Sequence, residues 1–204
     1  DKHWSRGLGD VYKRQGQARR MGGKDKPLLS IGGQTILDRQ LDATALHKVR
    51  VINANGDLSR FESYGLPVIP DSLPDWPGPL AGILSCLDWL AQSHCECDLL
   101  LSCATDAPFI SSDLAFRLLQ ARTAENATLA QARSSGRRHP VFGLWPVSIR
   151  QDLRTALIED GLRKIDDFTD RFSLAIADFA GHPDPFSNVN QPDDIAAAEA
   201  YFVS

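Results

Sequence analysis

"CDLLLSCATDAPF", residues 97–109, is a short apolar run that leads into a carboxylate and a proline. Leu99 to Cys103 is too short for a buried helix, and its nearly continuous apolar character is typical of a strand that is covered on both faces. Asp106 follows the strand, and Pro108 ends the regular structure. Strands of this kind occur in parallel sheets with helices on both sides, so this stretch predicts an α/β fold.

The segments around this strand alternate between strand and helix patterns. Residues 49–55 (VRVINAN) and 66–71 (LPVIPD) are short β-branched runs that end in polar residues. Residues 80–92 and 111–124 carry apolar residues at helical spacing, and Pro79 suits the first turn of the former helix. This alternation predicts right-handed crossovers and a mostly parallel sheet with helices on both faces.

The last third of the chain is less regular. Residues 127–145 suggest two extended segments joined by a Ser-Gly-Arg turn, which we interpret as a hairpin at the edge of the sheet. Residues 148–172 indicate two helices broken at Gly161, 174–179 a strand, and 191–202 a terminal helix with proline and acids in its first turn. No internal repeat or linker interrupts this order.

Composition favours one globular domain. The chain has 204 residues, 43% of them hydrophobic, and a formal net charge of -4. This mild acidity argues against a general nucleic-acid or membrane binder, so an anionic ligand must be met by a local basic cluster. No stretch has the character of a membrane span or a secretory signal, and the four cysteines suggest ordinary reduced thiols. We therefore expect a cytoplasmic protein.

Polar residues follow three of the predicted parallel strands. Asn53, Asp71 and Asp106 all fall at carboxyl ends, which is the edge of an open parallel sheet where ligands bind. Each residue alone equally suits a loop or a helix cap, because Asn and Asp are common in turns. Together they predict one binding crevice.

The stretch "GQARRMGGKDKPLL", residues 16–29, combines glycines with four basic residues. Backbone N–H groups of such a loop approach phosphate oxygens, and Arg and Lys neutralise their charge. The spacing matches neither G-x-x-x-x-G-K-[ST] nor G-x-G-x-x-G, which disfavours an ATPase and a dinucleotide-dependent dehydrogenase. We interpret the stretch as a cradle for a polyphosphate.

These motifs occur together in a known family. The stretches GQARRMGGKDKPLL, VINAN, PDSLPDWPGPLAGIL, TDAPF, RRHPVFGLW and FSNVNQPDD appear in the order and spacing of molybdenum cofactor guanylyltransferases. The chain resembles that family from Gly16 onward. The resemblance implies a Rossmann-like nucleotidyltransferase, a three-layer sandwich that transfers GMP from GTP to molybdopterin and yields molybdopterin guanine dinucleotide and pyrophosphate.

The resemblance also assigns roles to residues of this chain. It implies that Lys26, Arg19 and Arg20 meet the triphosphate, that Asn53 and Asp71 bind the nucleotide, and that Asp106 holds Mg²⁺. The loop glycines Gly16, Gly22 and Gly23 belong to the same nucleotide site, and Lys26, Arg20 and Asp106 form its catalytic set.

Two assignments leave a choice. Asn190 either supports the metal or a phosphate, or leads into the cap of the last helix. Arg138 and His139 are hypothesised to contact the anionic pterin, and His139 equally suits a structural role. Trp76 and Trp89 are interpreted as packing residues.

The chain departs from the family pattern before Gly16. Residues 1–15 read DKHWSRGLGDVYKRQ, where the family calls for an apolar strand running into Leu-Ala-Gly-Gly. Because SRGLGDVYKRQ resembles translated sequencing-adapter DNA, we interpret residues 1–15 as an anomalous, non-native segment and residues 16–204 as the single nucleotidyltransferase domain. We then expect the first strand to be missing.

Three other functions stay open at this point. They are a CTP-dependent molybdopterin nucleotidyltransferase, a sugar-phosphate nucleotidyltransferase, and a non-catalytic nucleotide- or cofactor-binding protein. The family resemblance further implies GTP and molybdopterin as binding partners, Mg²⁺ as cofactor, and contacts with molybdenum-insertion and molybdoenzyme maturation proteins. Neither a nucleic acid nor a membrane is expected as a partner.

Overall fold

The computed structural model describes residues 8–13, 25–73 and 78–203. Its strands are β1 Leu8–Lys13, β2 Ser30–Ile31, β3 Gln34–Thr35, β4 Val49–Asn53, β5 Val68–Ile69, β6 Leu99–Ala104, β7 Leu129–Ser134, β8 Arg137–Pro146 and β9 Leu174–Phe179. Its α-helices are α1 Ile36–Ala43, α2 Pro79–Ser93, α3 Leu114–Ala124, α4 Arg150–Ile158, α5 Ile165–Thr169 and α6 Pro192–Val203. Short 3-10 helices lie at Lys26–Leu28, Ser59–Tyr64 and Val147–Ile149.

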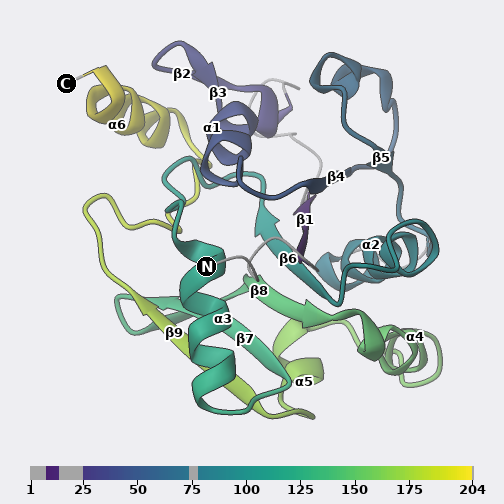
Figure 1. Ribbon diagram of the computed structural model, residues 1–204. Helices are drawn as coiled ribbons and strands as arrows, with labels where there is room; N and C mark the ends of the chain where they lie inside the picture. Colours follow the sequence, from purple (N-terminus) through teal and green to yellow (C-terminus); the bar gives the residue numbers. More distant parts are fainter. Residues whose placement is uncertain (1–7, 14–24, 74–77, 204) are drawn as a thin grey trace.

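A mixed sheet forms the centre of the fold (Figure 1), with strand order β5-β4-β1-β6-β8-β7-β9. The pairs β5–β4, β4–β1, β1–β6 and β7–β9 are parallel, and β8 runs antiparallel to both of its neighbours. The prediction of a mostly parallel sheet is confirmed.

Helices cover both faces of the sheet, as predicted. One core cluster joins α1 and α3 to the sheet through Leu37, Leu118 and Leu101. A second cluster packs α2, α4 and α5 on the opposite face, where Trp145 and Phe168 are fully buried. The molecule is therefore a three-layer α/β sandwich, as the sequence predicts.

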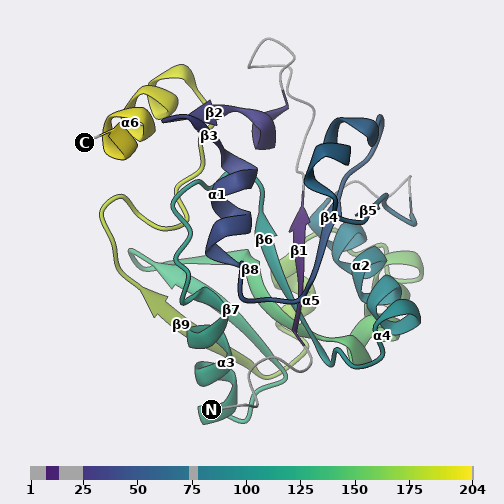
Figure 2. The same cartoon turned by 45° about the horizontal axis from the view of Figure 1, so that its top comes forward.

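Helix α6 packs away from the two main cores. It lies beside β2 and β3 in both ribbon views (Figures 1 and 2), and a third cluster formed by Ile31, Ile36, Val189 and Ala198 joins it to the start of α1. The short β2–β3 pair and α1 are elements that the sequence patterns did not reveal. Among the described residues, no helix combines the length and apolar character that crossing a bilayer requires.

The hairpin predicted near residue 135 is present but is not at the sheet edge. β7 and β8 pair antiparallel through the turn at Ser135 and Gly136, both with positive φ. β8 also pairs with β6, and β9 adds outside β7. The edge position was wrong because nothing in a local pattern shows that the later strand β9 pairs outside the hairpin.

The expectation that the first strand is missing is also wrong. Leu8–Lys13 forms β1 between β4 and β6, with Val11 in register with Val51 on one side and Ser102 on the other. A parallel ladder consists of backbone hydrogen bonds, so a segment without the family's apolar sequence can still occupy this position.

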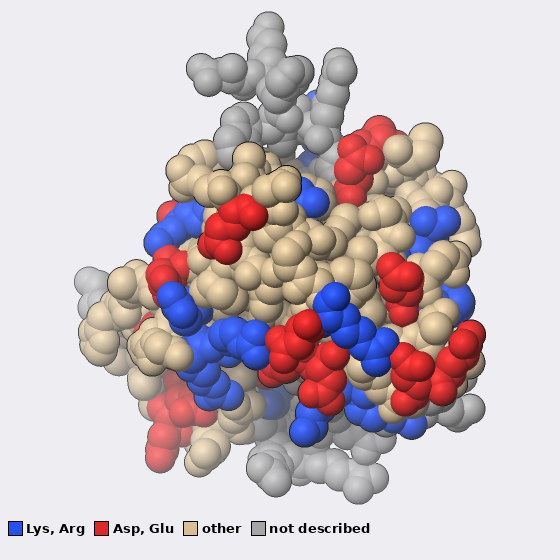
Figure 3. Space-filling model, turned by 90° about the horizontal axis from the view of Figure 1, so that it is seen from below, with Lys and Arg blue, Asp and Glu red and all other residues tan. Residues whose placement is uncertain are grey.

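Charges on the surface are mixed in sign. On the face seen in Figure 3, basic and acidic side chains lie next to one another instead of gathering by sign. Ion pairs of this kind include Arg171 with Asp160 and Arg133 with Asp178, each at 2.6 Å. Exposed pairs contribute little stability, about 0–1 kcal/mol each.

Candidate active site

The carboxyl ends of β4, β1 and β6 lie at one edge of the sheet, because these strands are parallel neighbours (Figure 2). Asn53 ends β4, Asp71 follows β5, and Asp106 follows β6. The predicted placement of these three polar residues at one edge is therefore confirmed. They belong to two hydrogen-bonded groups.

The first group joins the ends of β4 and β5. Asn53 Nδ2 donates to Ile69 O and to Asp71 Oδ1, both at 2.9 Å. Asn55 Nδ2 donates to the other carboxylate oxygen of Asp71 at 2.9 Å, and its Oδ1 accepts from the Asp71 backbone N–H at 2.8 Å. Both oxygens of Asp71 are thus held by amide donors, which fixes the carboxylate at the sheet edge. Asn55 was not singled out from the sequence, although it stands in the same polar strand end.

Arg60 connects this group to the segment that carries Lys26. Its Nη2 donates to Asn55 O at 2.7 Å, and its Nε lies 2.9 Å from Asp25 Oδ2. Arg60 comes from the 3-10 helix Ser59–Tyr64, whose polar sequence gives no local sign of this role. The arginine therefore ties residues at two separate places in the chain to one another.

The second group surrounds Asp106, in the turn between β6 and α3. The buried side chain of Gln40 on α1 donates to Ala104 O at 2.6 Å and to Ala107 O at 2.9 Å. These two hydrogen bonds fix the backbone before and after Asp106. Helix α1 thus positions the turn, and a pattern in the sequence around Asp106 cannot reveal a partner 64 residues away.

Burial is the main influence on the Asp106 carboxyl. It raises the pKa of Asp106, although the charge of Lys26 acts in the opposite direction. Asn188, with its amide nitrogen turned toward the acceptors around it, donates to Asp106 Oδ1 at 3.3 Å. Val189 N–H donates to Asp106 O at 2.8 Å. The described neighbours therefore stabilise the ionised form of the Asp106 carboxyl less than burial destabilises it.

Lys26 lies in the 3-10 helix Lys26–Leu28, and its Nζ donates to the side-chain oxygen of Asn190. The backbone N–H groups of Asn190 and Gln191 both donate to Asp194 Oδ2 at 2.8 Å, which caps the start of α6. The backbone of Asn190 therefore belongs to the cap, which is one of the two roles that the sequence left open, and its side chain bonds to Lys26. Support of a metal or a phosphate by Asn190 stays a prediction. Lys26, Asn190 and Asp106 form one cluster.

Five residues of the predicted nucleotide loop lie outside the described residues: Gly16, Arg19, Arg20, Gly22 and Gly23. Trp76 also lies outside them. Trp89 is partly buried against the second core cluster, and its ring lies tilted against that of His94, in agreement with a packing role.

Arg138 and His139 have different surroundings. Arg138 lies 3.2 Å from Asp166 and 3.4 Å from Asp170, two carboxylates at α5. These ion pairs direct Arg138 away from the role of an anion ligand at the carboxyl edge. His139 instead bonds to Ser134, with Nε2 and Oγ 2.7 Å apart.

The chemistry of Asp106 suits a hard divalent cation. Mg²⁺ is held in nucleotide enzymes by one or two carboxylates, with phosphate oxygens and water completing its shell. Among the described residues no cluster of three or more His, Cys, Asp or Glu side chains could enclose a metal alone. A single, partly buried carboxylate beside the charge of Lys26 fits that mode of binding.

Comparison with known proteins identifies the family. The MobA-like NTP transferase domain matches residues 16–172. A protein of Nitrobacter hamburgensis named molybdenum cofactor guanylyltransferase is 50% identical over 186 residues, which cover 90% of this chain and 89% of the relative. The chain belongs to the MobA-like NTP transferases. It is therefore a nucleotidyltransferase.

Solved MobA-like structures share this fold. Molybdopterin-guanine dinucleotide biosynthesis protein A of Archaeoglobus fulgidus has a TM-score of 0.73 at 21% identity, covering 95% of this chain and 97% of its own. A protein of Mycobacterium tuberculosis solved as a complex with manganese has a TM-score of 0.69 at 16% identity, covering 95% and 98%. These likenesses confirm the Rossmann-like nucleotidyltransferase fold.

Replacing Lys26 is expected to shift the pH profile of this nucleotidyltransferase. Lys26 lowers the pKa of Asp106, so Lys26→Met raises that pKa further. We expect the ionised carboxylate to be the form that binds a cation, so activity should be lost as pH falls through this pKa. We expect the acid limb of kcat/KM to move to higher pH in Lys26→Met. Steady-state rates between pH 5 and 8 would measure the shift.

The matched control is Lys48→Met. Lys48 is exposed and precedes β4, at the opposite edge of the sheet from Asp106. Its removal deletes the same charge without touching the cluster. An acid limb that stays in place in Lys26→Met, or that moves equally in both variants, would show that Lys26 does not act on Asp106.

Proposed function

We propose that this chain transfers GMP from GTP to molybdopterin, forming molybdopterin guanine dinucleotide and pyrophosphate. The observation that carries the proposal is the partly buried Asp106 carboxyl under the influence of the Lys26 charge, with Lys26 bonded to Asn190 at the carboxyl edge of the sheet. Relatives about half identical to the chain and aligned over 90% of it bear the name molybdenum cofactor guanylyltransferase. The chemistry of this cluster suits phosphate transfer, and the names of these relatives point to the same reaction.

Transfer of a nucleotidyl group requires positioning and charge neutralisation rather than a covalent intermediate. The acceptor phosphate oxygen forms a bond to the α-phosphorus of GTP, and the bond to the pyrophosphate oxygen breaks. In our proposal Lys26 faces the triphosphate and opposes the charge that collects on the leaving group. Arg19, Arg20 and the glycines Gly16, Gly22 and Gly23 complete this phosphate cradle.

Asp106 is proposed to hold Mg²⁺, with Asn190 supporting the metal or a phosphate from across the crevice. The metal, when bound, polarises the phosphate oxygens and neutralises charge on the departing pyrophosphate. The raised pKa of Asp106 supports this assignment, because a cation would supply the compensation that its protein neighbours leave incomplete.

Asn53 and Asp71 are proposed to bind the base or ribose of the nucleotide, with Asn55 as an added member of the group. Their support is the network that fixes the Asp71 carboxylate at the sheet edge. A carboxylate that amide donors hold in place is a preorganised hydrogen-bond acceptor. Guanine and cytosine present their N–H donors at different positions relative to such an acceptor.

Three further expectations stay proposals. We place the enzyme in the cytoplasm, supported by four free cysteines. We expect it to meet molybdenum-insertion and molybdoenzyme maturation proteins. We also propose that the family's own sequence in this chain begins at Gly16, supported by a family match that begins there; residues 8–13 supply the central strand β1 to the same domain.

Pyrophosphate release is the deciding measurement. The chain is incubated with molybdopterin and Mg²⁺, and release is compared for GTP, CTP and ATP. We expect GTP to be used at least about tenfold faster than CTP, the discrimination that one or two nucleobase hydrogen bonds supply. Faster release with CTP would replace guanylyl by cytidylyl transfer. Nucleotide binding without release from any of the three would leave a binding protein.

A further inference from the structure

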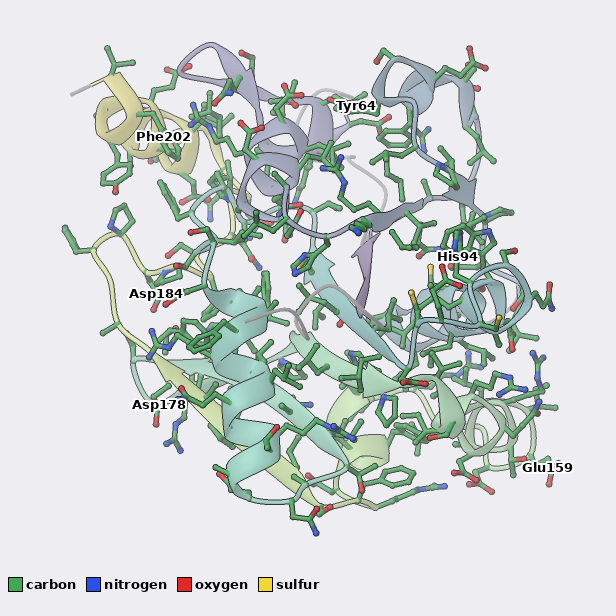
Figure 4. All side chains as sticks on the ribbon, viewed as in Figure 1. Tyr64, His94, Glu159, Asp178, Asp184 and Phe202 are labelled. Atoms are coloured by element: carbon green, nitrogen blue, oxygen red, sulfur yellow. The ribbon has the colours of Figure 1, made fainter. Side chains whose placement is uncertain are left out.

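Ser134, His139 and Asp184 form a hydrogen-bonded chain outside the two groups described above. Ser134 ends β7, His139 lies on β8, and Asp184 lies on the segment between β9 and α6, close to one end of α3 in Figure 4. β7 runs in the same direction as β6, because both are antiparallel to β8. The chain of three residues is therefore at the same sheet edge as Asp106.

The hydrogen bonds define which nitrogen of His139 carries a proton. Ser134 Oγ donates to Asp184 Oδ1 at 2.8 Å and lies 2.7 Å from His139 Nε2. A hydroxyl has one proton, and this one is given to Asp184, so Ser134 Oγ accepts from Nε2–H. Nδ1 of a neutral His139 then keeps a lone pair. No described residue hydrogen-bonds to Nδ1.

The charges of the three residues agree with this assignment. Burial raises the pKa of Asp184, but hydrogen bonds from Ser134, the Phe186 N–H and Ser135 outweigh it, so that the pKa is lowered and the carboxyl is ionised. Burial lowers the pKa of His139, with Arg137 acting in the same direction and Asp184 against it. The imidazole is therefore neutral at pH 7, which makes it unsuited to holding an anion by charge.

One short segment links His139 to the Asp106 cluster. The Phe186 ring packs against the His139 ring in a tilted arrangement with centroids 4.7 Å apart, and the Phe186 N–H donates to Asp184 Oδ1 at 2.9 Å. Three residues further along, Val189 N–H bonds to the Asp106 backbone. The segment 184–190 thus holds His139 on one side and the predicted metal carboxylate on the other.

We propose that Nδ1 of His139 accepts a hydrogen bond from an N–H group of the pterin in the acceptor substrate and selects that heterocycle. The proposal rests on the proposed function, because it concerns the second substrate of that reaction. A pterin carries ring and amino N–H donors, which match a fixed acceptor. The interaction replaces the hypothesis of a contact between His139 and an anionic group.

Two substitutions separate the two ring nitrogens. His139→Gln places its amide near Nε2 and keeps a partner for Ser134, but it removes the acceptor at Nδ1. His139→Asn places an amide oxygen near Nδ1 and keeps the acceptor. We expect KM for molybdopterin to rise about 5–10-fold in the Gln variant and to stay within about twofold in the Asn variant, the usual effect of losing or keeping one hydrogen bond.

The other kinetic constants distinguish recognition from a structural role. KM for GTP should be unchanged in both variants, since the residue group near Asp71 is not altered. The thermal midpoint should fall in both variants, because each loses the contact of the His139 ring with Phe186. Equal molybdopterin KM in the wild type and the Gln variant would overturn the proposal. So would a Gln variant whose KM rises equally for both substrates.

A measurement on the unmodified protein covers the case in which a variant does not fold. In ¹⁵N-histidine-labelled wild type at pH 7, His139 should show a protonated Nε2 and an unprotonated Nδ1, and the Nδ1 signal should shift when molybdopterin is added. A proton on Nδ1, or an unchanged Nδ1 signal at saturation, would refute the assignment.

The experiments distinguish an error in the role of His139 from an error in the proposed function. Absence of pyrophosphate release by the wild type with GTP and molybdopterin would contradict the proposed function. Full release by the wild type, with the Nδ1 acceptor dispensable, would contradict only the role of His139.

Discussion

Asp106→Asn is expected to abolish most of the transferase activity while making the folded protein more stable at neutral pH. The amide cannot replace an ionised carboxylate as a ligand for a hard cation, and losses of about 10²–10³-fold are usual when one electrostatic contributor to a transition state is removed. The rate of pyrophosphate release and the binding of Mn²⁺ by titration calorimetry would measure the loss.

The stability gain follows from the sign of the pKa shift. Burial raises the pKa of Asp106 in the folded protein, so the folded state binds a proton more tightly than the unfolded chain does. At pH values below the pKa of an unfolded Asp, the pKa shift does not lower the unfolding free energy. As the pH rises through the pKa that Asp106 has in the folded protein, the unfolding free energy becomes lower. Asn carries no charge, so the unfolding free energies of the two proteins should converge in acid and differ at pH 7.

The matched control for this substitution is Asp113→Asn. Asp113 stands in the same connection between β6 and α3, but its side chain is about half exposed and pairs with Arg117 one helical turn away. We expect less than about a twofold change in rate from that exposed position. Retained activity in Asp106→Asn, or a lower stability than wild type at pH 7, would contradict the proposed role of the buried carboxylate.

Val11→Pro is expected to destabilise the whole sheet. β1 pairs with a neighbour on each side, so every backbone N–H of the strand is needed in a ladder. Proline removes that donor and clashes with the neighbouring backbone, at a cost of at least about 3 kcal/mol. For a chain of this size, such a loss lowers the thermal midpoint by about 6–12 °C. Thermal unfolding followed by circular dichroism would measure it.

Val11→Thr serves as the control, because it keeps the backbone donor and a β-branched residue of similar size. It should unfold within a few degrees of the wild type. If the proline variant unfolded at the same temperature as the threonine variant, Leu8–Lys13 would not form the central strand. Residues 1–15 would then contribute nothing to the fold.

Local sequence patterns predicted most of the elements correctly. Three predicted elements match the structure to within about two residues: the buried run Leu99–Cys103 corresponds to β6, the β-branched run 49–55 to β4, and the helix 80–92 to α2. Such patterns succeed because burial on one or both faces imposes a period on the residues of the element itself. The family motifs added the expected chemistry of Lys26, Asp106 and Asn190.

Contacts between distant segments could not be predicted in this way. Gln40 holds the turn around Asp106, Arg60 joins Asp25 to Asn55, and Asn190 faces Lys26 from 164 residues away. None of these pairs leaves a repeating pattern, because each depends on where a long crossover returns the chain. The position of the β7–β8 hairpin inside the sheet was missed for the same reason.

The sequence by itself determined the α/β class and the polar strand ends, and it predicts a phosphate-binding loop at residues 16–29. Those properties follow from residue type and local period, which do not depend on distant neighbours. Tertiary structure alone decided that Leu8–Lys13 fills the central strand, that Asp106 has a raised pKa and that His139 is neutral. Strand pairing, burial and hydrogen-bond partners are set by segments far apart in the chain, and only the folded protein brings them together.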